Sequence, residues 1–525
     1  MAGGTNASSE ALLTGAIPAA VREILATLRA AGHGAYVVGG ALRDVLAGRA
    51  TADWDLTTSA LPEETTALFD DATYENRFGT VAVRRAGTDY QVTTMRTDHD
   101  YADFRRPHRV EFGSSIAADL ARRDFTMNAL AWGAETDRDI ELRLLDPYDG
   151  LVDIRDGVIR AVGEPRRRFE EDTLRIVRAV RFAATLGWAI EPATLAAIRE
   201  TAPLVAHLSG ERIASELEKL LAAERPSVGL RLLDETGVLA AISSDLAAQR
   251  GIDQNKFPGE DLWDHTMRTV DAAVHDPVVR WAALVHDIGK PATAANGHFL
   301  GHETVGAELA AALLDRLHLP AATRTQVVHL VRNHMFRYEP AWGDGAVRRF
   351  LARIGPAAIE NLFALREADN AGSDVPRNAD DLDELRARVA GEIAGGPILD
   401  RSALAIDGSN LMAELDLDAG PELGRVLAAL FDRVVENPEM NDRPTLLQAA
   451  REVHASGDRT ATETARTSGE LSVQLYSVRT ALAGDLDGTL GRIAGLGYRR
   501  VEPFDLLGVA AGLRDGLRAN GLSAP

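Results

Sequence analysis

A glycine pair followed closely by two aspartates is the feature that most restricts the fold of this sequence. Residues 36–44, YVVGGALRD, read as a short apolar strand, a turn at Gly39 and Gly40, and the start of a helix. Without side chains at the turn, a triphosphate can approach backbone N–H groups at the positive end of that helix. Arg43 follows one helical turn later, where its guanidinium would bind a phosphate through two hydrogen bonds. The segment therefore predicts a triphosphate site at a strand–helix junction.

Two acids stand ten residues further on, in a β-type run. Alternation along a strand places Asp53 and Asp55 on one face. Beside a triphosphate loop, such carboxylates can hold Mg²⁺ ions that activate an attacking hydroxyl and neutralise a pyrophosphate leaving group. An isolated pair of this kind is more often simply solvated. After the glycine turn, we expect a catalytic, Mg²⁺-binding pair.

The patterns divide the 525 residues into several units, as the length requires. The first part alternates β-rich runs with helical stretches, and most of the rest is helical. We therefore expect a multidomain protein with an α/β head, all-α regions behind it and a short β/α fragment at the end. The expected segments are 1–17 (flexible), 18–150 (α/β head), 151–254 (helical neck and body), 255–400 (histidine-rich helices), 401–455 (helices), 456–470 (linker) and 471–525 (β/α fragment).

Composition excludes several classes of protein. The chain contains no cysteine, which rules out disulfides, thiolate catalysis and zinc ribbons. It has no apolar run of 18 or more residues and no signal-peptide pattern at its start, so we expect a cytoplasmic protein without a membrane span. The net charge of −21 argues against broad, nonspecific nucleic-acid binding, although a local basic groove remains compatible with it.

Five blocks occur in a fixed order along most of the chain. They are GGALRD (39–44), the D-x-D pair, RRDFTMNALA (122–131), EDTLRIVRAVRF (171–182) and ERIASELEKLL (211–221). With these blocks, residues 21–455 resemble the class II tRNA nucleotidyltransferase and bacterial poly(A) polymerase family, within the polymerase-β-like superfamily. The resemblance implies a polymerase-β-like head on a helical neck and body, and the addition of nucleotides to RNA 3′ ends without a nucleic-acid template.

The resemblance also implies how the base is chosen. By position, Asp172 and Arg175 would read the Watson–Crick edge of the incoming CTP or ATP. A carboxylate accepts a hydrogen bond from an exocyclic amine, and arginine donates to ring and carbonyl acceptors. Arg178 and Arg181 would support the nucleotide, and they share a helix face with the first pair.

The remaining implied roles concern the phosphates and the catalytic loop. Arg123, with Arg43, would lie near the triphosphate. Asp124 is a candidate third catalytic carboxylate, with a structural role at a helix start as the alternative. Segment 96–112 resembles the family's mobile loop, which is associated with the switch from adding C to adding A.

A second motif lies in the histidine-rich region. Residues 284–291, LVHDIGKP, carry the signature of the HD phosphohydrolase superfamily. An adjacent His–Asp pair on a helix, joined by ligands from other helices, can hold a divalent metal that activates water. The expected ligands are His265, His286, Asp287, His302, His334 and Asp369. We expect a second divalent metal here; whether the domain hydrolyses a substrate is left open, since some tRNA nucleotidyltransferases carry cyclic phosphodiesterase or phosphatase activity in such a domain.

The final segment, 471–525, resembles the opening of a xylose-isomerase-like sugar phosphate isomerase/epimerase barrel. A complete (β/α)₈ barrel needs about 200 residues or more. We expect a truncated strand–helix–strand–helix fragment without its own activity, with an unrelated βα appendage as the alternative.

Together these patterns predict Mg²⁺-dependent transfer of CMP, CMP and AMP from CTP and ATP to the 3′-OH of tRNA, with release of pyrophosphate. The nearest alternatives are a poly(A) polymerase and a partner enzyme restricted to CC or A addition. An HD phosphohydrolase with a silent transferase half, and a noncatalytic RNA-binding scaffold, are alternatives from other classes.

Overall fold

A computed structural model gives the fold. It describes residues 3–76, 79–101, 107–113, 115–135, 142–254, 259–295, 297–373, 381–396, 400–466, 472–474, 485–496, 498, 500–502 and 510–523. The chain divides into two compact units: Met1–Pro340 with Ile354–Ala387, and Ala341–Arg353 with Arg388–Pro525.

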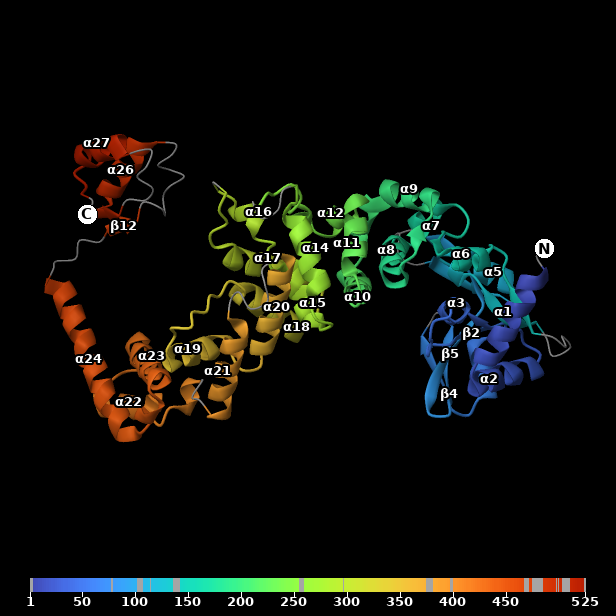
Figure 1. Cartoon of the computed structure of the whole chain (residues 1–525), viewed down its shortest axis with the longest axis horizontal. Helices are drawn as coiled ribbons and strands as arrows, with labels where there is room; N and C mark the ends of the chain where they lie inside the picture. The colour runs from blue at the N-terminus through green and yellow to red at the C-terminus, as the bar shows by residue number, and fades with distance from the viewer. Residues whose placement is uncertain are drawn as a thin grey trace. The chain divides into compact units, whose positions relative to one another are not determined.

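A seven-stranded mixed sheet forms the centre of the N-terminal part of the first unit (Figure 1). Its order is β3-β4-β5-β2-β1-β8-β9. Strand β1 is buried along its length and pairs antiparallel with β2 and β8, which places Val38 opposite Asp55. The glycine turn therefore leaves the sheet beside the second aspartate. The strands are β1 (Ala35–Val38), β2 (Asp55–Thr58), β3 (Ala72–Asn76), β4 (Thr80–Arg85), β5 (Thr88–Thr94), β8 (Ala131–Ala134) and β9 (Arg143–Leu145).

Helices cover this sheet, and one of them corrects an expectation. Residues 1–17 were expected to be flexible, but Gly3–Ala16 form helix α1, with Leu13 and Ile17 fully buried. The backbone N–H of Leu144 donates a hydrogen bond to Glu10, at 3.2 Å, which ties α1 to strand β9. The helices of this part are α1, α2 (Ala19–Ala30), α3 (Gly40–Leu46), α4 (Pro62–Leu68), α5 (Ile116–Ala121), the 3₁₀ turn η1 (Thr126–Asn128) and α6 (Gly150–Asp156).

The segment compared with a mobile loop forms a separate hairpin. Strands β6 (Arg96–Tyr101) and β7 (Pro107–Phe112) pair antiparallel, and residues 102–106 between them lie outside the described residues.

Helices follow the head as expected. Helix α7 begins with a Glu164 cap and proline at its first position, and α8 ends at Gly187, whose φ of 72° terminates the helix. Helix α8 packs against α10 and α11. The elements are β10 (Val158–Ile159), α7 (Pro165–Glu171), α8 (Leu174–Leu186), β11 (Ala189–Ile190), α9 (Pro192–Thr201), η2 (Ala202–His207), α10 (Gly210–Leu221), α11 (Pro226–Glu235), α12 (Val238–Ile242) and α13 (Ser244–Ala247).

The histidine-rich helices pack through close backbone approaches. A Cβ at Gly289, after the His–Asp pair, would lie 2.3 Å from the carbonyl oxygen of His302, so only glycine lets the start of α17 come this close. Helix α14 packs on α20, and α18 packs on α15 and α17. The bounds are α14 (Leu262–Ala272), α15 (Pro277–Val285), α16 (Lys290–Thr293), α17 (His302–Arg316), α18 (Ala321–Asn333) and α20 (Ile359–Gly372).

The second unit has its own apolar core. Leu411, Leu430 and Leu446, from three helices, are fully buried in it. The expected linker at 456–470 is wrong as far as Arg466, because α24 continues to that residue; 467–470 lie outside the described residues. The helices are α19 (Asp344–Ile354), α21 (Leu382–Ala394, shared with the first unit), η3 (Arg401–Ala403), α22 (Gly408–Leu415), α23 (Pro421–Glu436), η4 (Pro438–Met440) and α24 (Arg443–Arg466).

The C-terminal fragment contains alternating strands and helices. Its elements are β12 (Ser472–Gln474), α26 (Leu486–Gly495), β13 (Arg500–Glu502) and α27 (Ala510–Ala519). The two strands pair in parallel, and Leu490 and Val501 are fully buried in a small core.

Over the described residues, no single helix has the length and apolar composition needed to cross a membrane. One pair, Ser9–Ala16 with Ala19–Ala30, meets both criteria only when joined, and it is bent by 103°.

Candidate nucleotide-binding and metal sites

The glycine turn, one aspartate and one arginine meet at a single point. Gly39 has φ 78° and ψ −140°, a conformation that is essentially restricted to glycine. A Cβ there would lie 3.1 Å from Nη1 of Arg123 and 3.9 Å from a carboxylate oxygen of Asp55. Asp55 is the first residue of β2 and Asp53 lies just before that strand; both residues are exposed, whereas Trp54 between them is buried. The structure thus brings together most of the predicted triphosphate and metal residues.

The charges of the two aspartates are not fully compensated by the protein. Partial burial and the nearby carboxylate of Asp53 raise the pKa of Asp55, although Arg123 lowers it. Both raising effects disfavour the ionised form of Asp55, and a divalent cation beside it would offset them. The site is therefore suited to a metal ion.

Arg43 is held in place by partners within the protein. Its side chain is only 9% exposed, and its Nε and Nη2 donate to Asp44 at 2.9 and 3.0 Å. Its Nη1 donates to the side-chain oxygen of Asn128 at 2.8 Å. The guanidinium is therefore held beside Gly40 by protein partners, and its bidentate phosphate contact stays a prediction.

The predicted base-reading residues line one pocket of about 320 Å³. It lies where the RRD block meets the start of α8. Arg43 and Arg181 are not among the residues lining it. The lining residues are Arg122, Arg123, Asp124, Asp172, Leu174, Arg175, Arg178 and Arg212.

Both base-reading side chains are held in place by partners. Nη1 of Arg175 donates to Glu171 at 3.2 Å, and its Nη2 donates to the backbone oxygen of Arg122 at 2.7 Å. Nη2 of Arg212 contacts both carboxylate oxygens of Asp172, at 2.9 and 3.0 Å. The directions of the two side chains are thus fixed before a nucleotide arrives, which favours selective binding.

Asp124 serves as an anchor for an arginine. Its Oδ2 accepts hydrogen bonds from Nε and Nη2 of Arg178, at 2.9 and 2.7 Å. Burial alone would raise the pKa of Asp124, but Arg178 and the Asn128 amide lower it to about 2. The carboxylate therefore stays ionised and paired with Arg178; its catalytic and helix-start roles both stay predictions.

Arg181 lies behind the pocket. Its Nε donates to the buried Glu216 at 2.6 Å, and its guanidinium lies 3.8 Å from the centre of the Phe182 ring. The guanidinium groups of Arg43 and Arg178 also lie near this ring, at 5.0 and 5.4 Å. Phe182 is therefore a shared cation–π platform below the site.

Sequence reasoning missed two partners of the pocket. Arg212 and Glu216 both lie in the block 211–221, which was recognised without a role for either residue. Four-residue spacing on one face of α10 was the available signal. From that face Arg212 pairs with Asp172 and Glu216 pairs with Arg178.

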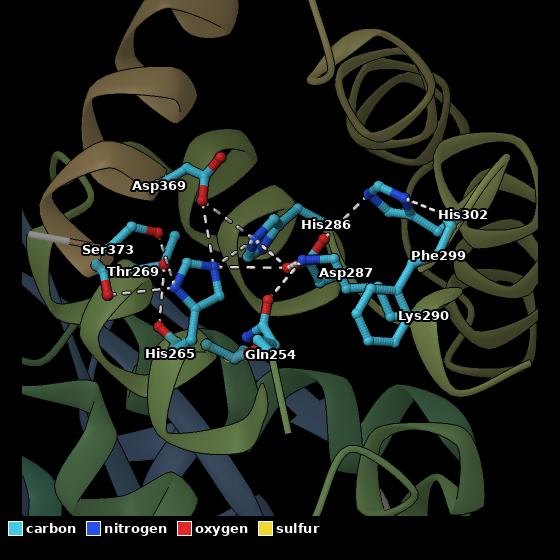
Figure 2. A network of polar contacts seen from close by, with 12 residues as sticks. Gln254, His265, Thr269, His286, Asp287, Lys290, Phe299, His302, Asp369 and Ser373 are labelled. Carbon is cyan, nitrogen blue, oxygen red and sulfur yellow. Dashed lines mark hydrogen bonds and ion pairs between the residues drawn. The ribbon is translucent and has the colours of Figure 1, made fainter. Parts of the chain in front are cut away.

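The six predicted HD residues also come together, in two groups. Figure 2 labels His265, His286, Asp287, His302 and Asp369 in this cluster. Asp287 stands between the groups. Its Oδ2 lies 3.5 and 3.1 Å from Nε2 of His265 and His286. Its Oδ1 lies 3.3 and 3.6 Å from Nε2 of His302 and His334. The first group is His265, His286 and Asp369, and the second is Asp287, His302 and His334.

Each of the four histidines is oriented by a backbone carbonyl. Their Nδ1 atoms lie 3.2, 2.9, 2.8 and 2.7 Å from the carbonyl oxygens of Gly372, Ala283, Phe299 and Val331, in chain order. A proton on Nδ1 leaves the Nε2 lone pair free, and all four Nε2 atoms face the cluster. This is the orientation that metal-binding histidines require.

The charge of the bridging aspartate also fits a metal ligand. Burial would raise the pKa of Asp287, but His286 and Lys290 hold it well below its usual range. Nζ of Lys290 lies 2.6 Å from Oδ2 of Asp287 and 2.7 Å from the side-chain oxygen of Gln254. A pocket of about 820 Å³ opens on this cluster, and Lys290 and Arg366 are cations in its wall.

Comparison with known families covers the head, body and HD regions separately. Residues 35–160 match the family described as "Poly A polymerase head domain", and residues 187–249 match "Probable RNA and SrmB- binding site of polymerase A". Residues 262–383 match the HD domain family.

Whole proteins of similar sequence extend the likeness over most of the chain. The CCA-adding enzyme of Geobacillus stearothermophilus is 34% identical over 421 residues, 80% of this chain and 93% of that protein. The CCA-adding enzyme of Lactiplantibacillus plantarum is 34% identical over 441 residues, 83% of this chain and 96% of that protein.

Solved structures agree with these relatives. The crystal structure of the Bacillus stearothermophilus CCA-adding enzyme in complex with CTP superimposes with a TM-score of 0.63 at 30% identity, over 85% of this chain and 100% of that one. The polymerase-β-like head, helical body and HD domain expected from the sequence are thereby confirmed. The chain belongs to the class II CCA-adding enzyme family of nucleotidyltransferases, in a form with an HD domain.

Proposed function

We propose that this protein adds CMP, CMP and AMP from CTP and ATP to the 3′ end of tRNA, with Mg²⁺ as the cofactor of the head. One observation supports this most: a pocket that joins a carboxylate and an arginine, Asp172 and Arg175, to the glycine turn through Arg123. Relatives that match the chain over more than nine-tenths of their own length are named CCA-adding enzymes, and one was solved with CTP.

Asp53 and Asp55 would hold the divalent ions of the head. When bound, Mg²⁺ supplies positive charge that stabilises the triphosphate and the departing pyrophosphate. Arg123 adds a fixed cation beside the glycine turn, where the absence of a side chain on Gly39 leaves room for phosphate oxygens. These residues bind and orient the reacting group but do not distinguish one base from another.

Base selection would rest with the two fixed side chains. Cytosine and adenine share an exocyclic amine donor next to a ring nitrogen acceptor. The Asp172 carboxylate would accept from the amine and Arg175 would donate to the ring nitrogen. Uracil and guanine present a carbonyl where the amine would be, so their oxygen would face a carboxylate and be rejected.

Product sequencing tests this proposal. The protein is incubated with tRNA lacking CCA, all four nucleoside triphosphates and Mg²⁺. We expect addition to stop after CCA; long A tracts would instead identify a poly(A) polymerase, and a stop after CC or after a single A would identify a partner enzyme. The double change Asp53→Ala with Asp55→Ala should abolish incorporation. Asp89→Ala, an exposed acid on β5 that pairs with Arg84, is the matched control and should leave it intact.

We propose a second activity, metal-dependent phosphohydrolysis, at the HD cluster. The supporting observation is two adjacent groups of three possible ligands, with Asp287 of one group also close to the histidines of the other. The Nδ1 atom of every histidine lies within hydrogen-bond distance of a backbone carbonyl oxygen. When bound, divalent metal there supplies Lewis acidity for hydrolysis of a phosphate ester. Four imidazoles and two carboxylates favour a transition metal over Mg²⁺. Lys290 and Arg366 would bind the anionic phosphate in the pocket wall.

Metal content and hydrolysis test this activity together. The wild-type protein is loaded with Mn²⁺ or Ni²⁺, dialysed, and assayed for bound metal and for cleavage of p-nitrophenyl phosphate and its diester. We expect Asp287→Ala to lose both metal and cleavage while tRNA extension continues. Metal retention without cleavage of either ester would refute the hydrolase and leave a structural metal site.

A further inference from the structure

A carboxylate that is completely buried beside the head pocket has no role in the chemistry described so far. Asp119, on helix α5, has 0% exposure. Its Oδ1 accepts from Nε and Nη2 of Arg122, at 3.1 and 2.5 Å. Its Oδ2 accepts from Nη2 of Arg123, at 3.2 Å. One acid therefore holds two consecutive arginines, one with each oxygen.

Burying an ionised carboxylate is costly unless partners compensate it. Burial would raise the pKa of Asp119, yet Arg123 and Arg122 lower it overall. The carboxylate therefore stays charged. Asp119 and the guanidinium groups of Arg122 and Arg123 hold one another in position. Such a mutually fixed cluster suits a site in which directions matter.

The three residues that follow α5 each reach a different part of the nucleotide site. The backbone oxygen of Arg122 accepts from Nη2 of Arg175, the base-reading arginine, at 2.7 Å. Nη1 of Arg123 lies beside the glycine turn at Gly39. The carboxylate of Asp124 holds the fourth arginine of the pocket, Arg178. A single backbone turn thus links the triphosphate end of the site to its base end.

We propose that Asp119 is a positioning residue for nucleotidyl transfer, which fixes this turn so that Arg123 and Arg175 act at a set separation. The inference rests on the proposed function and adds a residue to it. Without the carboxylate, Arg123 loses its charged partner and keeps a longer hydrogen bond, from Nη1 to the backbone oxygen of Asn128 at 3.4 Å. The Arg122 carbonyl is then less firmly held. Triphosphate binding and base selection should then weaken together, although Asp119 touches neither.

A purely structural role predicts something different. If Asp119 only stabilised the fold, its loss would lower the unfolding temperature and leave the properties of the folded site unchanged. Asp153 provides the comparison, because it is a carboxylate of similar burial, 4% exposed, that pairs with Arg160 and accepts from Thr126 at 2.6 Å. Neither of these partners lines the pocket.

The experiment compares Asp119→Asn with Asp153→Asn in the full chain. Asparagine keeps the shape of the side chain but removes its charge and one acceptor. CTP affinity is measured by calorimetry, and the ratio of UMP to CMP incorporation on tRNA lacking CCA by product sequencing. We expect Asp119→Asn to weaken CTP binding about tenfold, as expected for a lost charge-assisted hydrogen bond, and to raise misincorporation. We expect Asp153→Asn to change only the unfolding temperature.

A double-mutant cycle shows whether Asp119 acts through Arg123. In the background of Arg123→Ala, the effect of Asp119→Asn on CTP affinity should shrink, because its partner is already gone. Full additivity, or unchanged affinity and selectivity in Asp119→Asn, overturns the inference. If the wild type binds CTP more tightly than Asp119→Asn but does not extend tRNA, the inference is kept and the proposed function is refuted. A wild-type protein that binds no CTP refutes both.

Discussion

Removal of Arg212 tests whether base selection depends on a carboxylate held in one orientation. In the structure, Nη2 of Arg212 contacts both oxygens of Asp172, and each side chain is about a quarter exposed, at 23% and 24%. Within the described part of the chain, the one other hydrogen bond to this carboxylate comes from the backbone N–H of Leu174, at 3.2 Å. Arg212→Ala would therefore leave the Asp172 carboxylate with the Leu174 hydrogen bond to one oxygen, about which the carboxylate can rotate.

The size of the effect follows from the exposure of the pair. A hydrogen bond between charged groups contributes about 1.5–3 kcal/mol, and solvent reduces this to about 1–2 kcal/mol for a pair this exposed. At about 1.4 kcal/mol per factor of ten, CTP and ATP should bind about 5–30 times more weakly. Discrimination against UTP should fall together with these affinities, whereas the transfer rate at saturating CTP should change little.

A matched control isolates the cause. Arg231 pairs with Asp264 at 2.7 Å outside the pocket, and that aspartate is also 24% exposed. Arg231→Ala should therefore cost similar stability but leave CTP affinity unchanged in calorimetry. If Arg212→Ala binds CTP as well as or better than the wild type, a freely rotating Asp172 suffices and the argument for a held carboxylate is refuted.

Three further outcomes follow from the geometry. Gly39→Ala should cost about 1–3 kcal/mol in backbone strain and reduce kcat/KM for CTP strongly, because its Cβ would crowd Arg123 at 3.1 Å; transfer kinetics and calorimetric unfolding measure both. Asp124→Asn should destabilise the head by about 2 kcal/mol near neutral pH, since a pKa lowered from 3.8 to about 2 favours folding. That contribution is present above the unfolded pKa and is lost as the pH falls through about 2, so the gap between variant and wild type should narrow in calorimetry on acidification; a constant gap would contradict the assignment. His265→Ala should remove the Mn²⁺ bound by the first group of ligands, and His334→Ala that bound by the second. Asp287→Ala should lower the Mn²⁺ content of both groups, as elemental analysis of dialysed protein would show.

The sequence predicted those parts of the site whose residues are neighbours along the chain or belong to a recognisable motif. The glycine turn and the D-x-D pair are local, and strand pairing of Val38 with Asp55 brings them together. The HD ligands are spread over about a hundred residues, yet their order along the chain, which resembles that of the HD superfamily, identifies them. The structure brings all six into one cluster.

Long-range side-chain partners could not be predicted in this way. Arg43 was given to a phosphate because its place after the glycine turn suits one, but Asn128, 85 residues away, takes one of its donors. The N-terminal segment looked flexible from its small, polar residues. Its few apolar residues, such as Leu13 and Ile17, instead bury themselves against the head. In both cases tertiary packing adds contacts that the local signal does not show.

The strongly acidic chain and its arginine-rich pocket can be reconciled through pairing. Each of the five arginines that line the pocket has a carboxylate partner. The pairs are Arg122 and Arg123 with Asp119, Arg175 with Glu171, Arg178 with Asp124, and Arg212 with Asp172. A cluster of free guanidinium groups would attract any polyanion through long-range charge. Paired ones exert a weaker field and retain directional donors, so binding depends on whether a nucleotide's own donors and acceptors match. Selection without a nucleic-acid template requires this, because the protein must supply the directional contacts that a template base would otherwise provide.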